Sequence, residues 1–238
     1  MLGSWRIANE GWGVLALFGT GTILLSMLYL PLGCIALGVM LWLAFILREP
    51  QRVGPSDDAA VVAPADGRVV EISKAAFPND DAHPAWCITI AIGLADMQLQ
   101  LSPITGRVQD NFTLPGLFGF TDDREQMRRF NEKREIMLVA DTGAQVAVVQ
   151  YASRTARRLI CRHQEGKYLT RGTPLGMAPM AGVVELYLPE TAAPQVRVGM
   201  RVIAGETVLA VTSARAGRAS SSGRRASGRS RSSGGADV

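Results

Sequence analysis

The strongest pattern in the chain is an apolar run near its N-terminus. No charged residue occurs between Glu10 and Arg48, and this stretch is too long for the apolar region of a signal peptide. Pro31-Leu32-Gly33 divides it into Trp12–Leu30 and Cys34–Leu47, each close to the roughly 20 residues that a helix needs to cross a bilayer. We predict two short transmembrane helices joined by a turn at this Pro-Leu-Gly segment. The pattern also permits a re-entrant or interfacial hairpin, or a single tilted helix.

Basic residues flank the predicted hairpin on both ends. Arg6 precedes it, and Arg48 and Arg52 follow it. A hairpin places both flanks on one side of the membrane, and the positive-inside rule makes that side cytoplasmic. We therefore expect the rest of the chain on the cytoplasmic side of the cell inner membrane.

After the polar connector Glu49–Asp58, the pattern changes to short β-branched and aromatic runs bounded by turn residues. Many short strands with regular turn signals are typical of a β-sandwich or barrel. The segment Val198–Ala210, with two glycine turns that flank a short strand, resembles the closing hairpin of lipoyl-type β-sandwiches. Asp122–Lys133 is charged enough for a helix or a mobile loop. The predicted strands are Ala59–Val62, Val69–Ile72, Trp86–Ile92, Gly106–Val108, Ile136–Ala140, Gln145–Tyr151, Arg158–Cys161, Val183–Leu188 and Val208–Val211.

One turn sequence recurs three times in this part of the chain. Pro64-Ala-Asp-Gly67, Pro103-Ile-Thr-Gly106 and Pro179-Met-Ala-Gly182 share the pattern P-x-x-G, followed by Arg-Val or Val-Val. Proline pre-sets φ at the start of a turn, and glycine tolerates the conformations that other residues avoid. The unequal spacings argue against a solenoid repeat, so we predict architecturally similar turns.

Composition adds a third region. The net charge of +4 is concentrated in a Ser/Gly/Arg-rich tail, so a basic pI near 9.2 is weak evidence for nucleic-acid binding, and none is expected. The tail has no apolar period and is predicted to be disordered; its arginines would attract anionic lipid or simply keep it solvated. We divide the chain into a membrane hairpin (1–49), a β domain (50–212) and a tail (213–238).

Cysteine and histidine usage argues against disulfides and metal. Cys34, Cys87 and Cys161 are odd in number and scattered, without a C-x-x-C, as expected for free thiols in a reducing compartment. His83 and His163 are too few and too isolated for a metal cluster.

A set of short motifs then falls in a specific order along the chain. The motifs are Arg48-Glu-Pro after the apolar run, Pro64-Ala-Asp-Gly67, Asp96 before Ser102-Pro-Ile-Thr-Gly106, Asn131-Glu132, Ala156-Arg-Arg-Leu-Ile-Cys161-Arg, Arg171-Gly172 with Gly176-Met177, Glu185-Leu-Tyr-Leu-Pro189 and Gly205-Glu-Thr-Val. Together they resemble the short, bacterial form of phosphatidylserine decarboxylase, over about residues 5 to 211.

The resemblance implies a self-processing chemistry. In this family a serine in a Gly-Ser pair attacks the preceding carbonyl, the chain is cut, and the serine becomes an N-terminal pyruvoyl group. That group forms a Schiff base with the lipid amine and accepts electrons as CO₂ leaves. An Asp-His pair supports the cut, in the manner of a hydrolase triad.

Carried over to this chain, the chemistry is incomplete. The family's aspartate corresponds to Asp66, its histidine to Gln98 and its pyruvoyl-forming serine to Gly182. The amide of Gln98 does not titrate, and glycine has no nucleophile, so no pyruvoyl cofactor is expected. No serine occurs between Ser153 and Ser213.

A few further residues could take over parts of this chemistry or serve the fold instead. Gly172-Thr173 is the one nearby pair of glycine and a hydroxyl residue, and His163 is a displaced candidate base. Asp66 could also be a turn residue that bonds its own backbone, or one that accepts a bond from Gln98. Asn131 and Glu132 fit a solvated loop and the remnants of a lipid-headgroup site equally well.

Three hypotheses follow. The favoured one is a membrane-anchored, catalytically silent member of this family that binds phospholipid or a partner, such as an active paralogue or a second copy of itself. The second is an enzyme that still converts phosphatidylserine to phosphatidylethanolamine and CO₂ by a non-standard route. The third is a structural membrane scaffold.

Overall fold

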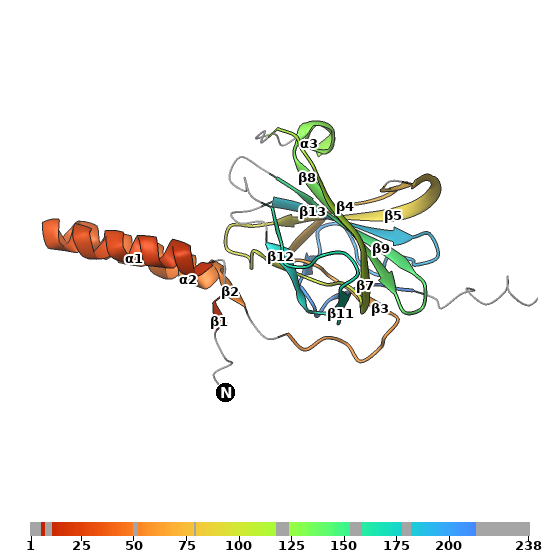
Figure 1. Cartoon of the computed structure of the whole chain (residues 1–238), viewed down its shortest axis with the longest axis horizontal. Helices are drawn as coiled ribbons and strands as arrows, with labels where there is room; N and C mark the ends of the chain where they lie inside the picture. Colours follow the sequence, from red (N-terminus) through yellow and green to blue (C-terminus); the bar gives the residue numbers. More distant parts are fainter. Residues whose placement is uncertain are drawn as a thin grey trace, which may run out of the picture.

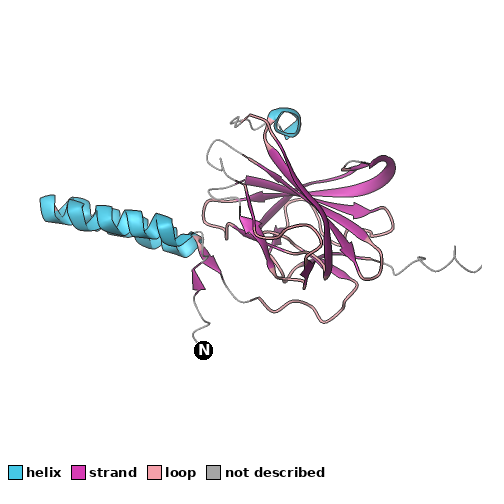
Figure 2. Cartoon of the chain, viewed as in Figure 1, coloured by secondary structure: helices cyan, strands magenta, loops and turns pink. Residues whose placement is uncertain are grey.

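The computed structural model describes residues 6–7, 11–49, 52–78, 80–117, 124–152, 159–177 and 182–212. Two helices project from one end of a β domain (Figure 1), and strands make up the body of that domain (Figure 2). The predicted mainly β fold after an apolar helix pair is therefore confirmed. The predicted tail, 213–238, lies outside the described residues.

The apolar run forms an antiparallel helix pair, α1 (Gly11–Leu28) and α2 (Leu30–Ile46). A strand pair closes its base, where β1 (Arg6–Ile7) lies beside β2 (Arg48–Glu49). The hydroxyl groups of Thr20 and Thr22 donate to the carbonyl oxygens four residues earlier, at 2.9 and 2.8 Å. The few polar side chains of α1 are thus satisfied within the helix, as an apolar solvent requires.

The helices are barely long enough to cross the hydrocarbon core of a bilayer. The 18 residues of α1 rise about 27 Å, against a hydrocarbon core of about 30 Å. Of the described helices, α1 is long and apolar enough to span a membrane, and the apolar part of α2, Leu30–Phe45, is shorter.

The turn between the helices is not where the proline predicts it. The chain breaks at Tyr29, which is extended (φ −157°), and Pro31 lies in the first turn of α2. Proline suits that position because its missing N–H has no intrahelical partner there and its φ is already helical. Gly33 instead serves packing, since a Cβ at this position would overlap Ser26 of α1.

The β domain contains strands β3 to β15 and one short helix, α3 (Arg124–Phe130). Its strands are β3 (Ala60–Val62), β4 (Gly67–Phe77), β5 (Asp80–Ile92), β6 (Leu99–Leu101), β7 (Gly106–Leu114), β8 (Lys133–Ala140), β9 (Gln145–Tyr151), β10 (Ile160–Cys161), β11 (Tyr168–Leu169), β12 (Pro174–Met177), β13 (Gly182–Pro189), β14 (Arg201–Val202) and β15 (Val208–Val211).

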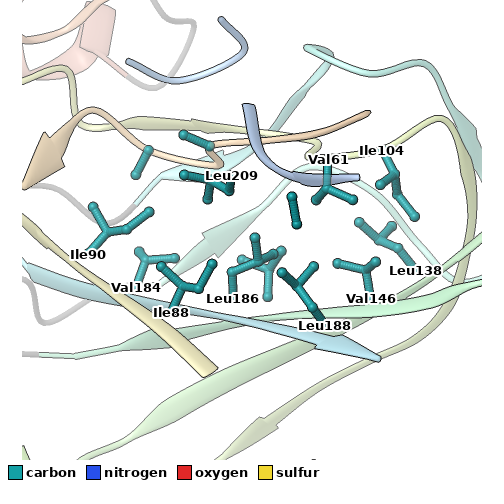
Figure 3. Close-up of a cluster of buried hydrophobic side chains, with 14 of the residues drawn as sticks. Val61, Ile88, Ile90, Ile104, Leu138, Val146, Val184, Leu186, Leu188 and Leu209 are labelled. Atoms are coloured by element: carbon teal, nitrogen blue, oxygen red, sulfur yellow. The ribbon is translucent and has the colours of Figure 1, made fainter. Parts of the chain in front are cut away.

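A curled eight-stranded antiparallel sheet forms one wall of the domain. Its order is β11-β7-β8-β9-β13-β5-β4-β14, and two small sheets, β10-β12-β6 and β15-β3, lie against it. The core fills the space between them: Val61 and Leu209 from the small sheets face Ile88 and Leu186 from the large one (Figure 3). The expected sandwich or barrel architecture is thus present.

Two halves of the domain are related by an internal pseudo-two-fold. The order of the large sheet reads the same from both ends if β11 matches β14, β7 matches β4, β8 matches β5, and β9 matches β13. Hydrogen bonds repeat with this match. The amide of Val69 donates to Met200 and that of Gly199 to Val69, as Val108 donates to Lys167 and Gly166 to Val108.

The side chains near these bonds repeat as well. Arg68 donates to the carbonyl of Gly199, and Arg107 donates to that of Gly166. The pairing of β15 with β3 and of β12 with β6 is interrupted at matching positions. The arrangement explains why one turn sequence recurs.

The recurring P-x-x-G sequences mark crossings from a small sheet to the large one. The first joins β3 to β4, the second joins β6 to β7, and the third stands between β12 and β13. In the first two, glycine is required because a Cβ at Gly67 or Gly106 would overlap the backbone of Ala91 or Val139 on the next strand. Residues 178–181 of the third lie outside the described residues.

Most predicted strands are present, and several are longer than predicted. The largest extension is in β4 and β5, whose polar outer halves pair as far as Phe77 and Asp80. The prediction did not find β6, β11 or β12, because these strands are only two to four residues long and form through partners distant in sequence. The segment predicted as helix or loop contains α3.

Candidate functional site

The three positions that the resemblance assigns to self-processing come together at one end of the large sheet. Gly182 begins β13 and pairs with Ile92, the last residue of β5. On the other side of β5, Arg68 pairs with Ala91, which puts Asp66 just beyond the start of β4. Gln98 ends the loop that leaves β5, next to Leu99, which pairs with Met177 of β12. The strands β4 and β13 flank one strand and so lie about 10 Å apart.

The pseudo-two-fold explains why this end is open. At the other end, β8 and β9 are joined by the short turn Asp141–Ala144. The matching strands β5 and β13 are not joined directly, because residues 93–181 are inserted between them. Their ends therefore lie side by side without a connecting turn, and we call this the open end of the sheet.

Asp66 links three segments at the open end. Its Oδ2 accepts a bond from Arg52 Nη2 at 2.9 Å, and its Oδ1 accepts one from the backbone amide of Ala204 at 2.7 Å. Both charged side chains are largely buried, with 13% and 16% of their surface exposed. The bonds observed at its two oxygens differ from the two predicted local ones, to its own turn and to Gln98.

One of these two bonds is architectural. In the matching half, Thr105 Oγ1 accepts a bond from the backbone amide of Arg171 at 3.1 Å, in the position that Asp66 and Ala204 hold. An oxygen at this place therefore serves the crossing turn in both halves. A threonine carries no charge to pair with an arginine, so the ion pair with Arg52 is what sets Asp66 apart.

Gln98 is completely buried, and its amide is committed to the loop. Nε2 donates to the carbonyls of Gly93 at 3.0 Å and Asp96 at 2.8 Å. Both amide protons thus brace the loop that connects β5 to β6. The side chain has no titratable group, so this position supplies no general base.

Gly182 is not required by its backbone. Its φ is not among the positive values that favour glycine, and among the described residues a Cβ built there would meet the carbonyl oxygen of Tyr151, at an ordinary 3.7 Å. Side chains alternate along a strand, so residue 182 would project on the same face as Val184, toward the core. The described residues therefore leave room for a side chain where the chain has none.

Thr173 and His163, the two residues considered as substitutes, lie near the start of β12, whereas Gly182 follows that strand. The hydroxyl of Thr173 is bonded to that of Thr170 at 2.8 Å. Nε2 of His163 lies 2.7 Å from the carbonyl of Pro174, the first residue of β12. Both side chains are therefore engaged in local structure.

Asn131 is not part of a solvated loop, which was one of the two predictions for this position. It is buried, and its Nδ2 donates to the carbonyl of Ala152 at 2.9 Å. Its neighbour Glu132 is half-buried, and its carbonyl accepts the amide of Ala152 at 2.8 Å. The two residues tie the end of α3 to the end of β9, beside the open end.

Polar side chains also enter the core next to Gly182. Gln150 pairs with Val184 in β13 and with Arg134 in β8, and it donates to Oε1 of Gln100. Both glutamines are completely buried, yet Nε2 of Gln100, Oε1 of Gln150 and Nε of Arg134 have no hydrogen-bond partner among the described residues. Unpaired buried donors and acceptors are costly, so this cluster is suited to a polar ligand group or to water.

A second polar cluster, on the outer face of the same sheet, was not predicted as a unit. Glu185 of β13 is completely buried; its Oε2 accepts from Tyr151 and Tyr187 at 2.8 and 2.9 Å. Its Oε1 accepts from Arg128 of α3 at 2.6 Å. Arg128 also reaches Glu71 at 3.2 Å. The alternation of Glu185 and Tyr187 with core residues is the one signal in the sequence that these side chains face away from the core.

Burial changes the acidity of the groups in this cluster. It raises the pKa of the Cys87 thiol to about 12, and the nearby Glu185 carboxylate adds to the effect. Burial likewise raises the pKa values of Tyr151 and Tyr187, with a further contribution from the negative charge of Glu185. These groups hold their protons at neutral pH and are not nucleophiles. No group of three potential metal ligands occurs in the part of the chain that the structure describes.

The helix pair meets the β domain beside the open end. Leu43 of α2 and Leu47 at its C-terminal end form a buried cluster with Met97, Leu99 and Met177, and with Ala204, whose amide donates to Asp66. The assigned positions are therefore adjacent to the base of the apolar helices.

Comparison with known proteins decides the family. The model of the family described as phosphatidylserine decarboxylase matches residues 40–210, well over half of the chain. The chain belongs to the phosphatidylserine decarboxylase family. Among its relatives, the phosphatidylserine decarboxylase proenzyme of Beijerinckia indica is 34% identical over 86% of this chain and 88% of the relative. The proenzyme of Geotalea uraniireducens is 35% identical over 86% of this chain and 96% of its own length, and that of Ruegeria pomeroyi is 32% identical over 84% and 93%.

The prosthetic group of the decarboxylase family does not fit the residues present here. A pyruvoyl group is made from a serine side chain, and the assigned position is Gly182. The hydrogen-bonding chemistry of Gln98 likewise differs from that of a histidine. Of the assigned set, the Asp66 carboxylate remains, held by Arg52 and Ala204.

Proposed function

We propose that this protein is a membrane-anchored member of the phosphatidylserine decarboxylase family that does not cleave itself and binds lipid without turnover. The observation that carries the proposal is Gly182. Its backbone accepts a side chain, so the missing nucleophile is not a requirement of the fold. Gln98 adds support, because its amide braces a loop and offers no base.

The polar cluster beside Gly182 favours binding over a purely structural role. Gln100, Gln150 and Arg134 together present two donors and one acceptor that find no partner within the described residues. The head group of phosphatidylserine, the substrate named for the relatives, carries complementary carboxylate, phosphate and ammonium groups. The base of the apolar helices beside the open end is suited to a ligand that remains in a membrane.

Denaturing mass measurement tests the absence of self-cleavage. The purified full chain is expected as one species of 25.5 kDa. Two fragments that meet near residue 181 would overturn the proposal. The measurement must be denaturing, because β13 lies in the middle of the large sheet and pairs with both β5 and β9. A cut chain would therefore stay assembled under native conditions.

Lipid binding and turnover are tested separately. The full chain in detergent should bind phosphatidylserine and release no CO₂. Gln150→Leu, which removes the unpaired acceptor, should weaken this binding, whereas Gln164→Leu, at an exposed position, should not. Decarboxylation by the uncut protein would favour the enzyme by a non-standard route. Equal binding by both variants would favour the scaffold.

A further inference from the structure

Four exposed apolar side chains of the β domain lie at the end that carries the apolar helices. Leu94 is 51% exposed, Val198 60%, Met200 44% and Ile203 38%. Leu94 lies in the loop that leaves β5, and the other three lie around β14. We call these four residues the hairpin-side rim.

The rim is one surface that continues from the base of the helices. An ion pair of 2.5 Å between Asp96 and Arg201 joins the loop of Leu94 to β14. Met97, which follows Asp96, and Ala204, which follows Ile203, belong to the same buried cluster as Leu43 of α2 and Leu47 at its C-terminal end. The same end of the domain thus carries an apolar helix pair and, directly beside it, an apolar edge.

The pseudo-two-fold supplies an internal control for this composition. The positions that match Leu94, Val198, Met200 and Ile203 lie at the far end of the sheet. They are occupied by Thr142, Glu165, Lys167 and Thr170, all exposed. The backbone hydrogen bonds around Met200 and Lys167 are the same. The fold therefore does not require apolar residues at these four positions. They are apolar at the end of the domain that carries the helices and polar at the opposite end.

Basic residues frame the rim. Arg68, Arg197 and Arg201 are exposed, and Arg68 reaches across to the carbonyl of Gly199 at 2.6 Å. Apolar side chains that enter the interfacial layer, with arginines at the level of the head groups, are the composition of a surface that lies on an anionic membrane. A hydrophobic contact between proteins would need a larger continuous apolar area.

We propose that the hairpin-side rim rests in the interfacial layer of an anionic phospholipid bilayer, with Arg68, Arg197 and Arg201 among the lipid head groups. The β domain then contacts the membrane directly and is not attached to it through the helices alone. This orientation turns the open end of the sheet, with Asp66 and Gly182, toward the head groups. It rests on the membrane anchoring in the proposed function, and it is independent of whether the chain cuts itself.

Site-directed fluorescence in vesicles tests the proposal. An environment-sensitive dye is attached to Met200→Cys in the full chain, in a background of Cys34→Ser and Cys161→Ser; Cys87 is buried. The protein is reconstituted in vesicles of phosphatidylcholine and phosphatidylglycerol that contain a lipid with a nitroxide on its head group. We expect a blue-shifted emission and loss of fluorescence at Met200. The matched control, Lys167→Cys, should show neither change.

Further measurements distinguish a failure of the helices to insert from a failure of the rim to contact the membrane. A dye at Leu24→Cys, exposed on α1, reports whether the helices are in the bilayer. Quenching at position 24 without quenching at 200, or equal quenching at 200 and 167, overturns the membrane contact of the rim. Lack of quenching at position 24 overturns the anchoring as well, whatever the mass measurement says of self-cleavage.

The charge and the identity of the partner are tested in the same preparation. Omission of phosphatidylglycerol, or high salt, should reduce the quenching at position 200, because exposed charges are screened by salt. Quenching that is the same without anionic lipid overturns the role of the arginines. A disulfide between two copies through Met200→Cys would overturn the proposal in favour of a contact between protein chains.

Discussion

At the scale of single residues, three glycines in the same turn sequence have different physical roles. Gly67 and Gly106 stand where the backbone of the next strand approaches too closely for a Cβ, and Gly182 does not. Asp66 and Thr105 show the reverse relation, since different side chains accept the same backbone bond in the two halves. A shared motif therefore identifies a shared place in the fold, and the neighbours at that place decide which of its residues are needed.

This contrast predicts the effect of adding a side chain. Gly182→Ser should change the free energy of unfolding by less than about 1 kcal/mol, because its Cβ would lie at an ordinary 3.7 Å from the nearest described backbone atom, the carbonyl oxygen of Tyr151. Gly67→Ser and Gly106→Ser should each destabilise by about 3 kcal/mol or more, because a strand has to move. Thermal unfolding of the three variants, followed by circular dichroism in detergent, measures the difference. Comparable losses for all three would contradict it.

At the scale of secondary-structure elements, β13 lies between β5 and β9 in the large sheet and is packed on both faces. Its inner face supplies Val184, Leu186 and Leu188 to the core, and its outer face buries Glu185. The short helix α3, with seven residues, is too short to be stable alone. It is held on the outer face by Met127, which packs against Val149 and Tyr151, and by the ion pair of Arg128 with Glu185.

Two adjacent arginines of α3 allow a matched test of this attachment. Arg128→Ala leaves the buried Glu185 carboxylate without its cation, and a loss of about 3 kcal/mol is expected. Arg129→Ala removes only the exposed pair with Glu125 and should cost less than about 1 kcal/mol. Denaturant unfolding of the two variants measures both losses.

If the unpaired charge of Glu185 causes the loss of stability in Arg128→Ala, removal of that charge should restore part of the stability. Adding Glu185→Gln to Arg128→Ala should recover part of the stability, as a double-mutant cycle would show. Equal losses for the two arginine variants would mean that Met127 and its apolar neighbours hold α3 unaided.

Across the whole molecule, two pseudo-equivalent halves have diverged in what they expose. One half faces the apolar helices and carries the rim, Asp66 and the open end; the other ends in polar turns. Stability, in contrast, is shared, because the core and the outer cluster around Glu185 draw on β5, β9 and β13 together.

The buried acids make a prediction for the pH dependence of unfolding. Their pKa values are raised in the fold above the ordinary 9.0 of Cys87 and 10.0 of Tyr151 and Tyr187. Below pH 9 the unfolded chain also holds these protons, and the stability is complete. Above it the unfolded chain releases them first, so stability should fall by up to about 1.4 kcal/mol per pH unit for each group.

Alkaline titration followed by circular dichroism and tyrosinate absorbance checks this. The absorbance of Tyr151 and Tyr187 should appear together with the loss of β structure. The variant with both Tyr151→Phe and Tyr187→Phe should lack the part of the tyrosinate absorbance that appears with unfolding. Ionisation of both phenols while the sheet stays intact would be evidence against it.

Local sequence patterns alone predict much of the fold. The uncharged run predicts the helix pair, and the β-branched runs predict β3, β9 and β15 within a residue of their observed bounds. The chemistry of the site is local in the same sense, because Gly182 has no nucleophile and Gln98 no titratable group in any fold. The family resemblance itself also depends only on the order of residues along the chain.

Contacts between residues far apart in the sequence decide the rest. The break at Tyr29, the short strands β6 and β12, and the bond from Ala204 to Asp66 all depend on partners that the chain brings in from elsewhere. The tertiary structure also shows that Gly182 has room for a side chain and that Met200 and Lys167 are counterparts at opposite ends. The physical reason is the same for each. The chemical groups of a residue are the same in any fold, but the space around it, its partners and the surface it faces depend on its neighbours in the tertiary structure.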